Sequence, residues 1–238
     1  IRLNRKNEDG TESLVAIKDF FYHKEQGRDP KTQAVTTNLG KEDDVERVKN
    51  KFRIEANKIK EFSDNEHIID VYEVFDENNT CYYSMEYIDG ESLGEHCKEQ
   101  GTIKERDALD IIRQVALALK SMHELQYNHH DVKPGNILID KNGRVVLVDF
   151  GPVHKYFNEY GIQNGNSLDG ETTLLKVRTE GYLPEYAYEI KQFHAGIDIY
   201  SLGATLYKIV TDKTPPNVCR MSEKPSRKLS DKARNAIK

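Results

Sequence analysis

Three side chains with a preference for phosphate or metal chemistry flank one short stretch of the sequence. Asp131 and Asn136 precede it, and Asp149 follows it. Residues 137–148 between them predict two short strands, joined by a tight turn at the Asn-Gly pair 142–143, which can supply two positive φ angles. Because the strands of a hairpin are antiparallel, Asn136 and Asp149 should be neighbours in space. Two oxygen ligands at one point suit Mg²⁺, and Asp131 is placed to act on a molecule brought near that cation.

The whole stretch over residues 128–151 resembles the catalytic loop and metal-binding triplet of protein kinases, H-R-D-x-K-x-x-N followed by D-F-G. The resemblance implies that Asp131 is the catalytic base and that Lys133 lies at the transferring phosphate. It also implies that Asn136 and Asp149 bind Mg²⁺. A lysine two residues after the base fits the Ser/Thr kinases rather than the tyrosine kinases.

Lys18 ends an apolar strand predicted over residues 13–19, which follows a first strand over 1–5 and a polar turn. A lysine in such a place can simply extend its ammonium group into water. The run Val-Ala-Ile-Lys that ends here is also similar to the V-A-I-K strand of kinases. That resemblance implies that Lys18 holds the α- and β-phosphates of ATP.

A helix predicted over residues 44–62, with Asp43 or Asp44 as its N-cap, carries a carboxylate on its apolar side. Glu55 fills the gap in a stripe formed by Val45, Val48, Phe52, Ile59 and Phe62. A carboxylate there is costly unless a cation meets it. Lys18 is the expected partner, since kinases have such a lysine–glutamate pair. The other interpretation is a glutamate at the edge of the stripe.

Two more strands, predicted over residues 68–75 and 81–87, complete an antiparallel sheet of about five strands if one more precedes Ile1. Residues 22–42 are polar, lack periodicity and predict a mobile loop. The resemblance implies that the nucleotide's adenine binds at one set of positions: Met85, Glu86, Tyr87, Ile88 and Leu138.

The second half of the chain contains two predicted helices. Thr102, with Glu105 three residues later, has the pattern of a capping box at the start of a long helix. A second apolar helix is predicted over residues 197–210. Asp198, near the start of this helix, begins a motif similar to D-x-W-S-L-G of kinases. In the family this aspartate braces the backbone of the catalytic loop.

Between these helices, residues 152–178 look like a kinase activation loop, and their polar, glycine-containing composition predicts a mobile segment. Thr179 occupies the place of a threonine that, in the family, hydrogen-bonds the catalytic lysine and aspartate. His130 replaces the arginine of H-R-D, which in the family receives an activation-loop phosphate. Phosphorylation of Thr172 or Thr173 is therefore expected to have little or no effect on activity.

The resemblance implies an α+β fold of the bilobal protein-kinase type. The N-lobe, residues 1–87, is a small antiparallel sheet with one main helix, and the C-lobe, residues 88–238, is mostly helical. We expect the domain to be truncated at both ends, because the glycine-rich loop is missing before Ile1 and only 27 residues follow Thr211. The run ending at Glu185 is one residue short of the A-P-E spacing.

Composition narrows the class of protein further. The 238 residues are 37% hydrophobic and 32% charged, which is typical of a globular chain. A net charge of −5 gives no electrostatic case for binding nucleic acid or an anionic membrane. No apolar run is long enough to span a membrane, and three scattered cysteines predict reduced thiols in a cytoplasmic protein. The adjacent pair His129-His130 and His123 are disfavoured as zinc ligands.

Three functions compete on this evidence. The first is a Ser/Thr protein kinase that uses ATP and Mg²⁺ and has a protein substrate. The second is a pseudokinase that serves as a nucleotide-binding or scaffold module, favoured by His130 and the missing parts. The third is a small-molecule kinase, which usually lacks the lysine two residues after the base. The sequence indicates no particular substrate and no oligomeric state.

Overall fold

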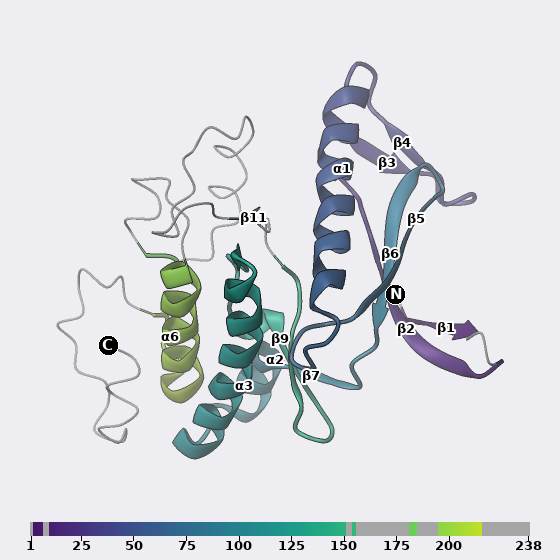
Figure 1. Ribbon diagram of the computed structural model, residues 1–238. Coiled ribbons are helices and arrows are strands. Elements are labelled where there is room, and N and C mark those ends of the chain that lie inside the picture. Colours follow the sequence, from purple (N-terminus) through teal and green to yellow (C-terminus); the bar gives the residue numbers. More distant parts are fainter. Residues whose placement is uncertain (1, 7–9, 151–153, 156–180, 185–194, 216–238) are drawn as a thin grey trace. The chain divides into compact units, whose positions relative to one another are not determined.

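The structure is a computed structural model, and it divides into two compact units (Figure 1). The first unit is residues 1–64 with 69–87, and the second is residues 65–68 with 88–238. Within them the structure describes residues 2–6, 10–150, 154–155, 181–184 and 195–215.

Four antiparallel strands form the sheet of the first unit, in the order β1-β2-β6-β5. They are β1 (Arg2–Lys6), β2 (Glu12–Asp19), β5 (Val71–Glu77) and β6 (Thr80–Glu86). The four predicted strands are confirmed, although β5 begins three residues later than expected. Asn78 and Asn79 turn the β5–β6 hairpin with φ angles of 52° and 61°. Asparagine tolerates this left-handed region better than most residues, which explains the tight turn.

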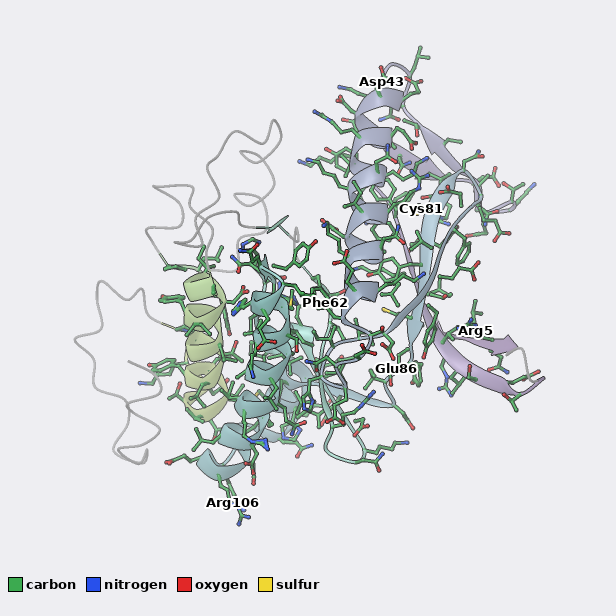
Figure 2. The ribbon with its side chains drawn as sticks, viewed as in Figure 1. Arg5, Asp43, Phe62, Cys81, Glu86 and Arg106 are labelled. Atoms are coloured by element: carbon green, nitrogen blue, oxygen red, sulfur yellow. The ribbon has the colours of Figure 1, made fainter. Side chains whose placement is uncertain are left out.

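Helix α1 (Glu42–Ile59) packs on β5 and β6 and is followed by a short 3-10 helix, η1 (Lys60–Phe62). The predicted N-cap is wrong, because the helix begins at Glu42 and Lys41 holds the cap position without a side-chain hydrogen bond. The three acidic residues lie instead in the first turn, where their charge suits the positive end of the helix dipole. Val45 packs in a core with Phe20 and Cys81. Figure 2 labels Cys81 among the side chains of this unit.

Residues 22–42 contain a small hairpin where the sequence predicts a mobile loop. Strand β3 (Gln26–Arg28) pairs with β4 (Val35–Thr37) in antiparallel fashion. The Asp29 carboxylate accepts hydrogen bonds from the backbone N–H groups of Lys31 and Thr32, at 2.8 and 2.7 Å, and so closes the turn. Strands of three residues are too short to produce a periodic pattern in the sequence.

Among its described residues, the second unit contains three α-helices and a small sheet. Strands β7 (Gly90–Ser92), β9 (Ile137–Asp140) and β10 (Val145–Leu147) form a sheet in the order β10-β9-β7, and β8 (Tyr127–Asn128) pairs with β11 (His154–Lys155). The helices are α2 (Leu93–Gln100), α3 (Glu105–Glu124) and α6 (Ala195–Thr211). A 3-10 turn, η2 (Pro134–Asn136), leads into β9. Helix α3 packs on α6, as their apolar faces predict.

The capping box of this unit lies at a different helix from the one expected. Helix α3 begins at Glu105 with Lys104 at its N-cap, so the predicted box at Thr102 is wrong. Ser92 and Glu95 form the box instead, at the start of α2. The Ser92 hydroxyl accepts from the backbone N–H of Glu95 at 3.1 Å, and the Glu95 carboxylate accepts from the backbone N–H of Ser92 at 2.9 Å.

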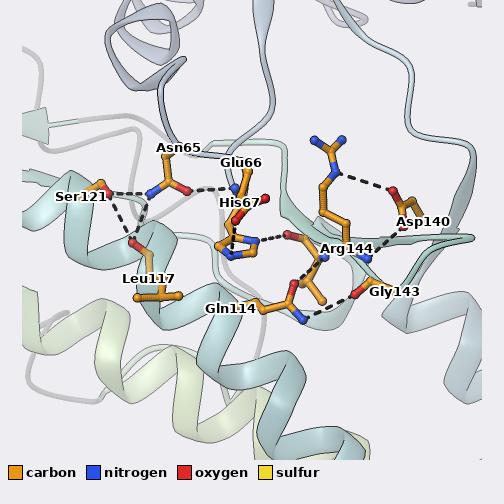
Figure 3. A network of polar contacts seen from close by, with 10 residues as sticks. Asn65, Glu66, His67, Gln114, Leu117, Ser121, Asp140, Gly143 and Arg144 are labelled. Atoms are coloured by element: carbon orange, nitrogen blue, oxygen red, sulfur yellow. Dashed lines mark hydrogen bonds and ion pairs between the residues drawn. The ribbon is translucent and has the colours of Figure 1, made fainter.

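A polar network explains why residues 65–68 belong to the second unit (Figure 3). The side-chain amide of Asn65 donates to the Ser121 hydroxyl of α3 at 2.6 Å. Nδ1 of His67 lies 3.0 Å from the backbone oxygen of Val145, so Nδ1 carries the proton. The backbone N–H of Leu147 donates to the oxygen of His67 at 2.9 Å. These bonds tie the segment to both α3 and the β9–β10 hairpin.

Candidate active site

The hairpin that carries the candidate site is confirmed. Strands β9 and β10 are antiparallel, with Ile139 opposite Val145 and Ile137 opposite Leu147. The turn differs from the prediction, since only Gly143 has a positive φ, of 83°. The Asp140 carboxylate accepts from the backbone N–H groups of Asn142 and Arg144, at 2.8 and 2.9 Å. The backbone N–H of Asp140 also donates to the oxygen of Arg144 at 3.0 Å, so this pair closes a loop of three residues, 141–143, with glycine at its left-handed position, a common hairpin form.

Asn136 and Asp149 are neighbours, as the hairpin geometry predicts. The backbone N–H of Val148 donates to the oxygen of Asn136 at 2.9 Å, and Nδ2 of Asn136 lies 3.3 Å from the backbone oxygen of Asp149. Asn136 is buried, whereas Asp149 is exposed and has a φ of 52°. A non-glycine residue at such a φ is strained, which is common at functional sites.

The Asn136 side chain is oriented by Asp131. Its Nδ2 donates to the carboxylate oxygen Oδ2 of Asp131 at 2.7 Å and to the backbone oxygen of Asp131 at 2.9 Å. Since Nδ2 is taken up by these acceptors, the amide oxygen Oδ1 remains the atom with which Asn136 can bind a cation.

Lys133 lies at the same carboxylate. Its Nζ is 2.7 Å from Oδ2 of Asp131, whose side chain is 11% exposed. Within the described part of the chain, both Lys133 and Asn136 contact Oδ2, and no hydrogen bond reaches Oδ1. Asp131 therefore presents one oxygen held between two donors and one oxygen able to accept a proton from an incoming hydroxyl.

Asp198 holds the backbone of this loop in place. It is fully buried at the start of α6, and its two oxygens accept from the backbone N–H groups of His129 and His130, both at 2.8 Å. The bracing role implied by the resemblance is confirmed. Burial opposes ionisation of Asp198, but the hydrogen bond from His123, at 2.9 Å, holds its pKa below the ordinary value.

His129 is a neutral packing residue in this loop. Burial lowers its pKa to about 4, against the opposing effect of Asp198 and Asp131. Its ring lies 4.6 Å from the ring of Phe150, centroid to centroid, and its Nδ1 accepts from the backbone N–H of Asp131 at 3.2 Å. The sequence points to His123 only as a disfavoured zinc ligand, and its bond to Asp198 was not predicted. No local signal reveals that bond, since the partners are 75 residues apart.

The first unit contains the predicted Lys18 and Glu55. Lys18 lies in β2 opposite Tyr83 of β6, with its Nζ 5.8 Å from the centre of the Tyr83 ring. Burial raises the pKa of Glu55 to about 7, and the charges of Lys18 and Lys51 act against that rise. Glu55 is thus within electrostatic reach of Lys18, and a direct ion pair between them stays a prediction.

The remaining predicted residues fall in both units. Met85 and Glu86 end β6, with Met85 opposite Ala16 of β2 and Tyr87 directly after the strand. Ile88 is buried in the second unit, where Leu138 pairs with Ser92 and Val146. The expected activation loop, 152–178, lies outside the described residues except for strand β11. Thr179 and Glu185 lie outside them as well. Among the helices that the structure describes, none is long and apolar enough to cross a membrane.

Comparison with known proteins identifies the family. The protein kinase domain family matches residues 10–235. The chain is 33% identical over 171 residues to the serine/threonine-protein kinase PknA of Corynebacterium glutamicum, covering 70% of this chain and 34% of that protein. It is 30% identical over 169 residues to the probable serine/threonine-protein kinase zyg-1 of Caenorhabditis elegans, covering 71% of this chain and 23% of that protein.

The chain spans about a quarter to a third of the length of these relatives. A solved structure titled PpkA-294 apo form has the same fold, with a TM-score of 0.77 over 95% of this chain and 81% of that chain, at 22% identity. The bilobal fold expected from the sequence is confirmed. The chain belongs to the protein kinase domain family.

Proposed function

We propose that this domain transfers the γ-phosphoryl group of ATP to Ser/Thr hydroxyls of protein substrates. The observation that carries the proposal is the arrangement at Asp131, whose Oδ2 is held by Lys133 and Asn136 at 2.7 Å each. A carboxylate fixed in this way can receive the proton of a hydroxyl while a neighbouring ammonium meets the charge of the transferring phosphate.

The side chains present fit ATP with Mg²⁺. Asn136 has its amide oxygen left for a cation, and Asp149 adds an exposed carboxylate next to it. Oxygen ligands from an amide and a carboxylate are those that Mg²⁺ accepts, and the cation, when bound, neutralises charge on the phosphates. Lys18 would hold the α- and β-phosphates, with Glu55 as its partner. Met85, Glu86, Tyr87, Ile88 and Leu138 would line the adenine site.

Thr179 would complete the arrangement by hydrogen-bonding Lys133 and Asp131, as the family resemblance implies. The hydroxyl substrate would then meet a base that directly follows the loop residues His129 and His130, whose backbone N–H groups Asp198 holds at 2.8 Å each. Rigid support of this kind favours the reaction, because phosphoryl transfer depends mainly on positioning and charge stabilisation.

The alternatives have less support. The relatives above are named serine/threonine-protein kinases, which favours a catalytic protein kinase over a pseudokinase or a small-molecule kinase. His130 does not remove a group that contacts the reacting atoms, since Asp131, Lys133 and Asn136 keep their mutual contacts.

The test is phosphoryl transfer from ATP to Ser/Thr-containing peptides by the full-length protein with Mg²⁺. Asp131→Asn removes the base, and we expect a loss of roughly 10²–10⁴-fold in turnover. Asp149→Asn should abolish turnover while the far-UV circular dichroism stays unchanged. Asp110→Asn, an exposed aspartate on α3, is the matched control and should leave turnover unaltered. Undiminished turnover in the first two variants would refute the mechanism.

A further inference from the structure

Arg53 of helix α1 makes an ionic contact with the sheet of the first unit. One guanidinium nitrogen lies 2.7 Å from the carboxylate of Asp76 in β5. The other terminal guanidinium nitrogen, Nη1, lies 2.9 Å from the carboxylate of Glu46 and 2.6 Å from the side-chain oxygen of Asn50. Three acceptors thus hold the planar group, and Asp76 is the one that belongs to the sheet. A guanidinium held at both nitrogens fixes direction as well as distance.

The geometry of the helix relates this contact to the candidate active site. Glu46, Asn50 and Arg53 are spaced four and three residues apart and so share one side of α1. Glu55 follows Arg53 by two residues, which at 3.6 residues per turn places it about 200° around the axis. Through Arg53, the helix therefore contacts β5, which is an edge strand of the sheet. On the other side of the helix, Glu55 lies within electrostatic reach of Lys18 in β2.

Apolar packing on the same turn of α1 acts together with the Arg53 contact. Phe52 packs against Tyr83 at 5.0 Å and against Phe20 at 5.8 Å, centroid to centroid. These ring contacts hold the helix against Phe20 and Tyr83 of the sheet unit. The charged contact is directional, and the Arg53 side chain is only 25% exposed.

We propose that Arg53 is a positioning residue for phosphoryl transfer, which fixes the rotation of α1 on β5 through Asp76 so that Glu55 stays directed at Lys18. The inference rests on the proposed function for its catalytic consequence. Its structural part, the orientation of Glu55, can be measured without any turnover.

The first readout is the pH titration of the Glu55 carboxyl group, which is monitored by NMR in the full-length protein without nucleotide. Arg53→Gln removes the contact, and we expect the pKa of Glu55 to fall from about 7 toward the ordinary glutamate value as the side chain reaches water. Asp76→Asn breaks the same contact from the strand, at a side chain that is 59% exposed, and should have the same effect. This second variant decides the matter if Arg53→Gln folds poorly.

The second readout is steady-state kinetics with ATP as the varied substrate. Both variants should raise the KM for ATP or lower kcat/KM by roughly tenfold, because a displaced glutamate misplaces the phosphate-binding lysine. Arg53→Lys keeps the charge and should recover a large part of the loss. Arg47→Gln is the matched control, because Arg47 pairs with Asp44 on the same helix at 2.9 Å, and it should change neither readout.

Two results would overturn the proposal. One is a Glu55 titration and an ATP KM in Asp76→Asn that match the unaltered protein. The other is an equal change in Arg47→Gln, which would show a general effect of removing positive charge from α1. Absence of phosphoryl transfer in the unaltered protein would instead refute the proposed function, and the Glu55 titration would still decide the role of Arg53.

Discussion

Replacing Glu55 by glutamine should make the protein more stable at neutral and alkaline pH. The folded-state pKa of about 7 compares with an ordinary value of 4.5, and burial is the main cause of the rise. The folded protein therefore holds a proton that the unfolded chain has released. Stability from this group is fully present below pH 4.5 and is lost as the pH rises through 7. Glutamine cannot titrate, so the variant lacks this loss.

The size of the effect follows from the two pKa values. Their difference is about 2.5, and each pKa unit corresponds to about 1.36 kcal/mol, so the cost of ionising Glu55 approaches roughly 3 kcal/mol above pH 8. Partial exposure of the side chain makes this an upper bound. We expect the advantage of Glu55→Gln in unfolding free energy to be near zero at pH 4.5 and to grow to at most about 3 kcal/mol at pH 8.

Urea unfolding followed by far-UV circular dichroism, at a series of pH values between 4.5 and 8.5, measures this difference. Glu61→Gln, at an exposed position directly after α1, is the matched control and should run parallel to the unaltered protein. A constant difference across the pH range would contradict the burial argument. An unaltered protein more stable than Glu55→Gln at pH 8 would show that attraction to Lys18 outweighs burial. The same variant should lose phosphoryl transfer, as expected of a residue kept at a cost in stability.

Three further outcomes are expected. Asp198→Ala leaves two backbone N–H groups and an imidazole without their buried acceptor, and urea unfolding should show a loss of about 3–5 kcal/mol; a loss under 1 kcal/mol would contradict the bracing role. Asn128→Leu should raise the melting temperature, with a gain of about 1–3 kcal/mol, because the amide of this fully buried residue has no hydrogen-bond partner among the described residues; a lower melting temperature would indicate a bound water or another partner. The double variant Thr172→Ala/Thr173→Ala should keep its turnover whereas Thr179→Ala loses it, and the reverse result in a peptide phosphorylation assay would overturn the assignment made from the sequence.

The sequence by itself determined the parts of the protein that depend on neighbours along the chain. The β9–β10 hairpin was predictable because its strands pair across a short loop, so Asn136 and Asp149 had to meet. The apolar faces of α3 and α6 were also predictable, since helical periodicity is a local property. The first residues of the helices were less predictable from sequence. Lys41 and Lys104 hold the N-cap positions although neither side chain makes a capping hydrogen bond.

Tertiary structure alone decided the contacts that hold the candidate site in place. Asp198 meets the N–H groups of His129 and His130 across about 70 residues, and Arg53 meets Asp76 across 23. The pKa of Glu55 likewise depends on how deeply α1 packs against the sheet, because desolvation competes with the charges of nearby lysines. Burial and long-range pairing arise only when distant segments pack together, and no pattern within a single segment contains that information.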